Sequence, residues 1–141
     1  MNLTPPYGVN MWLVMDSRIR ALYKIEAQPE APAEARRIIA EELSSLLPDA
    51  TLDDVKLMVS ELVTNGIVHS DESSRDPVML DVCVNGGVRC RVLDDGPGFA
   101  ERVTQATQRG WGLRVVEQLS DRWGMQCSPQ RTEVWFERQC A

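Results

Sequence analysis

Apolar residues recur along this chain with two different spacings, which separate the predicted strands from the predicted helices. Over residues 78–84 every second residue is apolar, the period of a strand with one buried face. The turn formers Asn85-Gly86-Gly87 follow, and residues 88–92 repeat the alternation. The pattern therefore predicts a hairpin whose second strand ends at Asp94. Its inward-facing residues are Val78, Leu80, Val82, Val84, Val88, Cys90 and Val92.

A spacing near 3.6 residues predicts helices in other parts of the chain. Ala33 to Leu47 has helix-forming composition, and Pro48 stops it. Thr51 is the expected N-cap of the next helix, and a third helix is expected from Gly112 to Ser120. The residues expected to face the core are Ile38, Ile39, Leu43, Leu46, Leu47, Val55, Met58, Val59, Leu62, Leu113, Val116 and Leu119.

Further strands are predicted near both ends of the chain. We expect a short strand at Met11–Met15, a longer one at Arg20–Ala27, and a last hairpin from Trp123–Cys127 and Thr132–Arg138. Helices mixed with hairpins, rather than with repeated crossovers, indicate an α+β fold. The expected architecture is a two-layer sandwich, in which a mixed, mostly antiparallel sheet is covered on one face by helices.

Composition and charge narrow the class of protein. With 141 residues, 43% of them hydrophobic, the chain can form one compact domain, which we expect over residues 20–141 after a leader over residues 1–19. The net charge of −6 argues against nucleic acid as a partner, because phosphate-backbone binding needs a basic face. Without an apolar run long enough for a membrane span, or a secretory signal pattern, we expect a cytoplasmic protein with no membrane partner.

The first candidate for chemistry is the helix that carries ELVTNGIVHS, residues 61–70. Glu61, Asn65 and His69 are spaced four residues apart, so their side chains share one face of this helix. The amide oxygen of Asn65 suits a magnesium ion already balanced by phosphates, and Glu61 could deprotonate a nucleophile beside the terminal phosphate. On this pattern alone, a solvated helix face is the more common explanation of such a stripe. His69, the sole histidine, could contact phosphate, but capping the helix end is its more common role.

The second candidate is DDGPGF, residues 94–99, at the end of a predicted strand. The carboxylate of Asp94 can accept a hydrogen bond from an exocyclic amine such as that of adenine. Gly96 and Gly98 would let the backbone approach a flat ring closely. Because Asp-Gly and Pro-Gly are also common turn formers, this segment taken alone is more often a turn than a binding site.

The third candidate is GWGL, residues 110–113, where a predicted helix begins. Gly110 and Gly112 would expose backbone N–H groups and the positive end of the helix dipole, both of which attract phosphate. Arg109 and Arg114 flank the segment and could also touch phosphate. A lone G-x-G motif has little specificity, so the segment gains weight only in combination with the other two.

Together, ELVTN, DDGPGF and GWGL resemble the three nucleotide-binding boxes of the GHKL ATPase superfamily, whose members have the histidine-kinase-like, or Bergerat, ATP-binding fold. The SELVTNGIVHS segment and the closing RWGM and TEVWFE segments most resemble the anti-sigma-factor serine kinases. A histidine kinase would need a phosphoacceptor histidine on a helical hairpin, whereas His69, the sole histidine, lies inside the first box.

This resemblance implies an ATP site with Mg²⁺ and a role for each matching residue. Asn65 would bind Mg²⁺, Asp94 would bind the adenine amine, and Glu61 would act as the general base. Thr132 matches the threonine that relatives place beside an adenine-bound water. The remaining ATP-binding residues implied by the boxes are Gly96, Gly98, Gly110, Gly112 and Leu113.

The resemblance also implies an activity and partners. An anti-sigma-type serine protein kinase would transfer the γ-phosphate of ATP to a serine of an antagonist protein, and would also hold a sigma factor inactive. The alternative is a non-catalytic module that uses ATP only to order a lid and so switches its affinity for a partner protein. The sequence leaves open the identity of both partners and whether the protein forms a homodimer.

Overall fold

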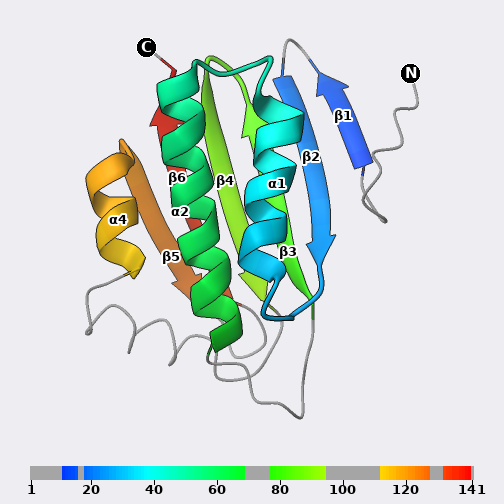
Figure 1. The fold of residues 1–141 in the computed structure, drawn as a ribbon. Helices are drawn as coiled ribbons and strands as arrows, with labels where there is room; N and C mark the ends of the chain where they lie inside the picture. Colours follow the sequence, from blue (N-terminus) through cyan, green and yellow to red (C-terminus); the bar gives the residue numbers. More distant parts are fainter. Residues whose placement is uncertain (1–10, 16–17, 69–76, 95–111, 128–131, 141) are drawn as a thin grey trace.

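The computed structural model describes residues 11–15, 18–68, 77–94, 112–127 and 132–140. Their strands and helices, in chain order, are β1 (Met11–Met15), β2 (Arg18–Ile25), α1 (Ala31–Leu43), α2 (Asp49–Val68), β3 (Val78–Val84), β4 (Gly87–Asp94), α4 (Gly112–Leu119), β5 (Arg122–Cys127) and β6 (Thr132–Gln139). The strands form one six-stranded sheet in the order β1-β2-β3-β4-β6-β5, and each is antiparallel to its neighbours. The described helices all lie on one face of this sheet (Figure 1).

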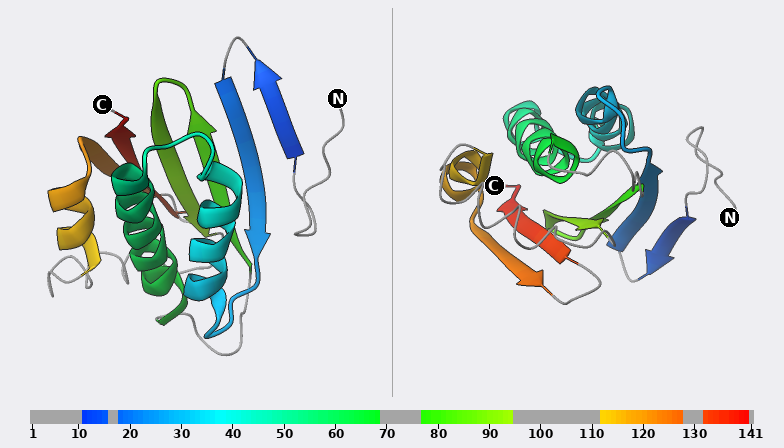
Figure 2. Two further views of the ribbon diagram at one scale, coloured as in Figure 1. Left: turned by 45° about the horizontal axis from the view of Figure 1, so that its top comes forward. Right: turned by 90° about the horizontal axis from the view of Figure 1, so that it is seen from below.

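The view along the layers shows helices on one side and strands on the other (Figure 2). This arrangement confirms the predicted α+β sandwich. β1 belongs to the predicted leader, and it pairs with β2 from Met11 opposite Leu22 to Met15 opposite Arg18. A division between leader and domain at residue 20 stays a prediction. In the part of the chain that the structure describes, no helix is long and apolar enough to cross a membrane.

The core fills the space between the two layers. Leu80, Cys90 and Val92 of β3 and β4 are buried, as their alternation predicts, and they join one hydrophobic cluster with Met58 and Val59 of α2. Burying one such aliphatic side chain contributes roughly 1.5–3 kcal/mol to stability. The cluster therefore holds α2 against the middle of the sheet.

The start of α2 differs from the prediction. Thr51 is not the N-cap, because the helix begins at Asp49 and Thr51 is buried within its first turn. The N–H of Leu52 donates to the carbonyl of Pro48 at 2.9 Å. Proline lacks an N–H, but its carbonyl can still accept the first helical hydrogen bond, so the helix can begin immediately after it.

The end of α1 also differs from the prediction. The helix stops at Leu43, and the N–H groups of Leu46 and Leu47 both donate to the Leu43 carbonyl, at 3.0 and 3.1 Å. This turn takes the two leucines off the helical stripe. Leu47 still reaches the core, as predicted, whereas Leu46 is 37% exposed, so its assignment to the core was wrong.

A tight turn joins β3 to β4 at the end of the sheet far from Asp94. Gly86 has a φ angle of +70°, a conformation that residues with a Cβ rarely adopt. The N–H of Asn85 donates to the carbonyl of Gly87 at 2.9 Å and closes the turn. The turn sets the register in which Val84 lies opposite Val88. The predicted hairpin is confirmed.

β6 gives the sheet its non-sequential strand order. It follows β5 in the chain but lies between β5 and β4, and it pairs with both. Near its end, Nη2 of Arg138 donates to Oδ2 of Asp54 on α2 at 3.2 Å. The last described strand is therefore attached both to the middle of the sheet and to the helix layer.

The sheet face turned away from the described helices carries an ion-pair cluster centred on Asp81, whose side chain is 4% exposed. Arg20 donates to both carboxylate oxygens, at 3.1 and 2.8 Å, and Nε of Arg91 donates to Oδ2 at 3.0 Å. Burial alone would raise the pKa of Asp81, but hydrogen bonds from Arg20 and Arg91, with the attraction of their charges, hold it below its usual 3.8. The cluster thus keeps this carboxyl group ionised.

Replacing this carboxylate should destabilise the fold in a pH-dependent way. Asp81→Asn should lower the free energy of unfolding near neutral pH by roughly 1–3 kcal/mol, because the arginines lose a buried charged partner. The pKa of Asp81 is lower in the folded than in the unfolded protein, so its contribution is present above the unfolded pKa and is lost as the pH falls through the folded value. Urea unfolding of both proteins at a series of pH values measures this difference.

Glu137→Gln serves as the matched control on the same sheet face. Its partner Arg122 has a side chain that is 69% exposed, so the loss should stay below about 1 kcal/mol. A difference between wild type and Asp81→Asn that stays constant from neutral pH down to about pH 2 would contradict the assigned role of Asp81.

Candidate functional site

Four chain segments meet at the lower edge of the molecule in Figure 1. α2 and β4 end there, and β6 and α4 begin there. Each of the three sequence segments singled out for chemistry includes an end of one of these elements: Val68 of α2, Asp94 of β4 or Gly112 of α4. The fold therefore gathers, from positions far apart in the chain, the described parts of all three segments.

Asp94 and Thr132 form the end of the β4–β6 pair. Their Cα atoms are register partners, as the last residue of β4 and the first residue of β6. Alternation along each strand turns both side chains toward the helix layer, together with buried Val92 and Val134. Asp94 is 4% exposed and Thr132 is 2% exposed. A carboxylate and a hydroxyl thus lie side by side in a nearly water-free position.

Glu61 and Asn65 lie one turn apart in the C-terminal half of α2. Both are half-buried, and the adjoining core residues Leu62 and Val63 fix the rotation of the helix. Among the residues described, Nδ2 of Asn65 is one of the few buried side-chain atoms without a hydrogen-bond partner. A buried amide that finds no partner costs stability, so it is a candidate for binding a ligand rather than for holding the fold.

Two hydroxyl groups next to this pair donate hydrogen bonds to backbone carbonyls of the same helix. Oγ of Ser60 donates to the carbonyl of Leu57 at 2.9 Å, and Oγ1 of Thr64 donates to the carbonyl of Ser60 at 2.7 Å. Such back-bonding satisfies these hydroxyls locally. Glu61 and Asn65 are therefore the polar side chains that this stretch of α2 offers to a ligand.

Of the third segment, residues 110–113, the structure describes Gly112, the first residue of α4, and Leu113. Leu113 is 3% exposed and belongs to the hydrophobic core, which anchors the start of this helix. Its predicted contact with a nucleotide stays a prediction. The predicted residues Gly96, Gly98 and Gly110 lie outside the described residues, as does His69.

The sequence reading missed a pair of charged residues beside the site. Glu133 follows Thr132 on β6, and its Oε1 accepts a hydrogen bond from Nη1 of Arg91 at 2.9 Å. The available signal was the alternation of charged with apolar residues along β4 and β6. That signal did not identify the partners, because the register between β4 and β6 was unknown.

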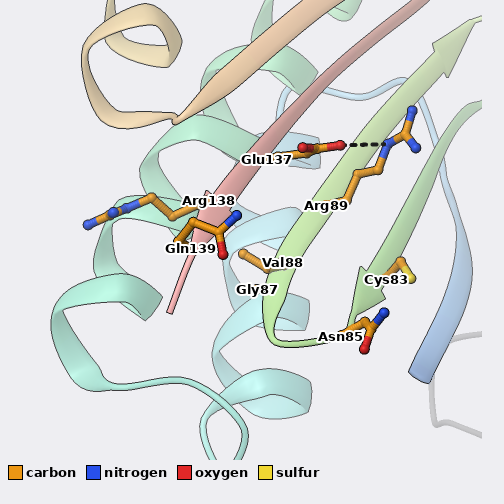
Figure 3. A pocket seen from close by; sticks show the side chains of 8 residues that line it. All are labelled: Cys83, Asn85, Gly87, Val88, Arg89, Glu137, Arg138 and Gln139. Carbon is orange, nitrogen blue, oxygen red and sulfur yellow. Dashed lines mark ion pairs between the residues drawn. The ribbon is translucent and has the colours of Figure 1, made fainter. Parts of the chain in front are cut away.

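A separate hollow of about 350 Å³ lies near the Asn85–Gly87 turn, at the opposite end of β4 (Figure 3). Arg89 and Glu137 line it, with Nε and Oε1 3.9 Å apart. Arg138 also lines it but is bonded to Asp54. Because the charges around this hollow are largely paired, and none of the predicted site residues lines it, we do not assign it a role in nucleotide binding.

The chain is similar to known proteins in sequence and in fold. The chain is 32% identical over 90 residues to an anti-sigma F factor of Heyndrickxia coagulans, a match that covers 52% of this chain and 60% of that protein. The chain thus spans less than two thirds of this relative's length. The fold also matches the crystal structure of the RsbU and RsbW domains of Rv1364c from Mycobacterium tuberculosis, with a TM-score of 0.69 at 18% identity, over 85% of this chain and 32% of that chain.

The family match covers most of the chain. Residues 25–138 match the histidine kinase-like ATPase domain, a range that runs from the end of β2 to the end of β6 and includes every described site residue. The resemblance seen in the three sequence segments is confirmed. The chain belongs to the histidine kinase-like ATPase domain family.

Proposed function

We propose that the chain binds ATP with Mg²⁺ at the lower edge and acts as an anti-sigma-type serine protein kinase. In this function it transfers the γ-phosphate of ATP to a serine of an antagonist protein, and it also binds a sigma factor. The observation that carries the proposal is the convergence of Asn65, Asp94 and Thr132 from separate elements at one edge of a fold of the ATPase family. The similarity to an anti-sigma F factor supports the choice of partners.

Adenine recognition is assigned to the end of the β4–β6 pair. A carboxylate oxygen of Asp94 would accept a hydrogen bond from the 6-amino group, and Thr132 would hold a water beside the ring. The burial of both residues favours this role, since a hydrogen bond shielded from water discriminates strongly against a ligand that cannot make it. Gly96 and Gly98 would allow the ring to approach the backbone.

Metal binding is assigned to Asn65. Its side chain fits the task, because a neutral amide oxygen suits Mg²⁺ that already carries phosphate oxygens and water. The unpartnered Nδ2 is a donor that a phosphate oxygen beside the metal would satisfy. Within the described residues no three His, Cys, Asp or Glu side chains gather as metal ligands. When bound, Mg²⁺ would offset negative charge on the phosphates.

The chemical step is assigned to Glu61, one turn before Asn65. The serine oxygen of the antagonist protein would attack the γ-phosphorus, the bond to the bridging oxygen of ADP would break, and the serine proton would pass to the Glu61 carboxylate. Gly110 and Gly112, with Leu113 as an anchor, would present N–H groups at the start of α4 to the phosphates. These groups would stabilise the charge of the transferring phosphoryl.

Removing the proposed adenine acceptor should weaken ATP binding selectively. Asp94→Asn turns an amide toward the 6-amino group and should raise the Kd for Mg-ATP roughly 10- to 100-fold, the worth of one hydrogen bond to a charged group. Isothermal titration calorimetry measures this Kd. Asp53→Asn makes the same chemical change at an exposed position of α2 and should leave the Kd unchanged. Equal Kd values for Asp94→Asn and wild type would exclude Asp94 from the site.

Replacing Asn65 with an apolar residue should abolish Mg-ATP binding without lowering the stability of the fold. Asn65→Leu removes a buried N–H that lacks a partner, so the free energy of unfolding without nucleotide should stay the same or rise by roughly 1 kcal/mol, while Mg-ATP binding is lost. Urea unfolding measures the change in stability, and calorimetry measures the loss of Mg-ATP binding. Thr64→Val, in the same turn, is the control, and it should retain binding. A large loss of stability in Asn65→Leu would mean that the amide serves the fold instead.

Removing the proposed base should slow phosphoryl transfer but leave ATP affinity unchanged. Glu61→Gln keeps the size of the side chain and should lower the rate of phosphoryl transfer by about 10²–10⁴-fold. The measurement uses ATP labelled on its γ-phosphate with candidate antagonist proteins, and Glu117→Gln on exposed α4 surface is the control. Normal transfer by Glu61→Gln would refute the assignment. A wild type that binds ATP but labels no candidate would favour the non-catalytic switch.

A further inference from the structure

Arg91 connects three neighbouring strands through a single guanidinium group. From β4 its Nε donates to Oδ2 of Asp81 on β3 at 3.0 Å, and its Nη1 donates to Oε1 of Glu133 on β6 at 2.9 Å. The side chains are 29% exposed for Arg91, 4% for Asp81 and 15% for Glu133. Pairs this well shielded are stronger and more rigid than ordinary surface ion pairs.

The ion pair between Arg91 and Glu133 lies next to the proposed adenine pair, on the opposite face of the sheet. In the register, Leu93 lies opposite Glu133, one step from Asp94 opposite Thr132. Arg91 itself lies opposite Trp135, so its guanidinium reaches diagonally toward the lower edge to meet Glu133. The pair therefore joins β4 to β6 one step before the position where β4 ends and β6 begins.

Such a connection matters most at the end of a strand pair. Asp94 is the last residue of β4 and Thr132 the first of β6, so within the described chain the ladder between these strands stops at them. Strand ends open more easily than strand centres. A hydrogen bond to the exocyclic amine of adenine needs its acceptor held within a few tenths of an ångström, which a frayed end would not provide.

A second set of ion pairs on the same face offers a comparison. Oε1 of Glu137 lies 3.9 Å from Nε of Arg89, and Oε2 lies 3.1 Å from Nε of Arg122. These arginines are 48% and 69% exposed, and Glu137 lies four residues farther along β6, away from the lower edge. The two glutamates thus share a strand and a face but differ in their distance from the proposed adenine pair.

We infer that Arg91 and Glu133 are positioning residues for adenine recognition, which hold β4 and β6 together so that Asp94 and Thr132 keep the spacing that selects a 6-amino purine. This inference rests on the proposed function, since it assigns the means by which the ATP site acquires its base specificity. Neither residue would touch the nucleotide, because both side chains lie on the other face of the sheet from Asp94.

The test compares ATP with inosine triphosphate, which carries a 6-oxo group where ATP carries the amine. Glu133→Ala should weaken ATP binding about tenfold, the worth of one weakened hydrogen bond, and should leave inosine triphosphate binding nearly unchanged. The ratio of the Kd for inosine triphosphate to the Kd for ATP should therefore fall about tenfold. Both are measured by calorimetry on the full chain with Mg²⁺, well below the melting temperature of each variant.

Two conservative variants separate positioning from a general loss of stability. Glu133→Gln keeps an acceptor for Arg91 and should recover part of the ATP preference. Arg91→Lys keeps the charge but cannot reach both carboxylates, so it should lose the preference as Glu133→Ala does. Glu137→Ala, the control, should lower the melting temperature yet keep the wild-type ratio.

The outcomes are distinct. If Glu133→Ala and Arg91→Lys kept the wild-type ratio of the two nucleotide Kd values, the inference would be overturned while the ATP site stayed in place. A parallel loss of both nucleotides in proportion to the loss of stability would also overturn it, because the pair would then be purely structural. If the wild type bound neither nucleotide, the proposed function itself would fail, and that result is visible before any variant is measured.

Discussion

The pairing of β6 with β4 is the interaction on which the rest of the structure depends. It joins the end of a central strand to the beginning of the last described strand, and so places Asp94 opposite Thr132. Without this pairing, the buried carboxylate and hydroxyl would belong to separate parts of the chain. The same pairing provides the surface on which α2 packs, and α2 carries Glu61 and Asn65. The proposed site is therefore a product of topology more than of local sequence.

The two faces of the sheet contribute differently to this pairing. The inner face supplies apolar burial, which is strong but not directional, through residues such as Val92, Val134 and Phe136. The outer face supplies the directional contacts of the ion pairs around Asp81 and Arg91. Burial brings the layers together and opposes a one-residue slip, because that slip would exchange the two faces. The ion pairs add directional contacts between neighbouring strands.

Much of the fold could be predicted because it depends on local periodicity. Alternation along β3 and β4 and the 3.6-residue spacing in α2 are properties of short segments, and both were confirmed. Thr51 and Leu46 were assigned wrongly because helix ends depend on which carbonyl accepts the first or last hydrogen bond, and propensities do not determine that. The partnership of Arg91 with Glu133 depends on the pairing of distant strands, so no local pattern could reveal it.

The late position of β6 in the chain has a consequence for biosynthesis. While a ribosome is still making the residues after Asp94, the edge of β4 has no strand to pair with, although β3 and β4 are already complete. An unpaired central edge is a template for association between nascent chains. Contacts such as that from Arg138 back to Asp54, 84 residues earlier, form only after Arg138 has been made. Chaperone protection during that interval would matter more for this topology than for a sheet completed in chain order.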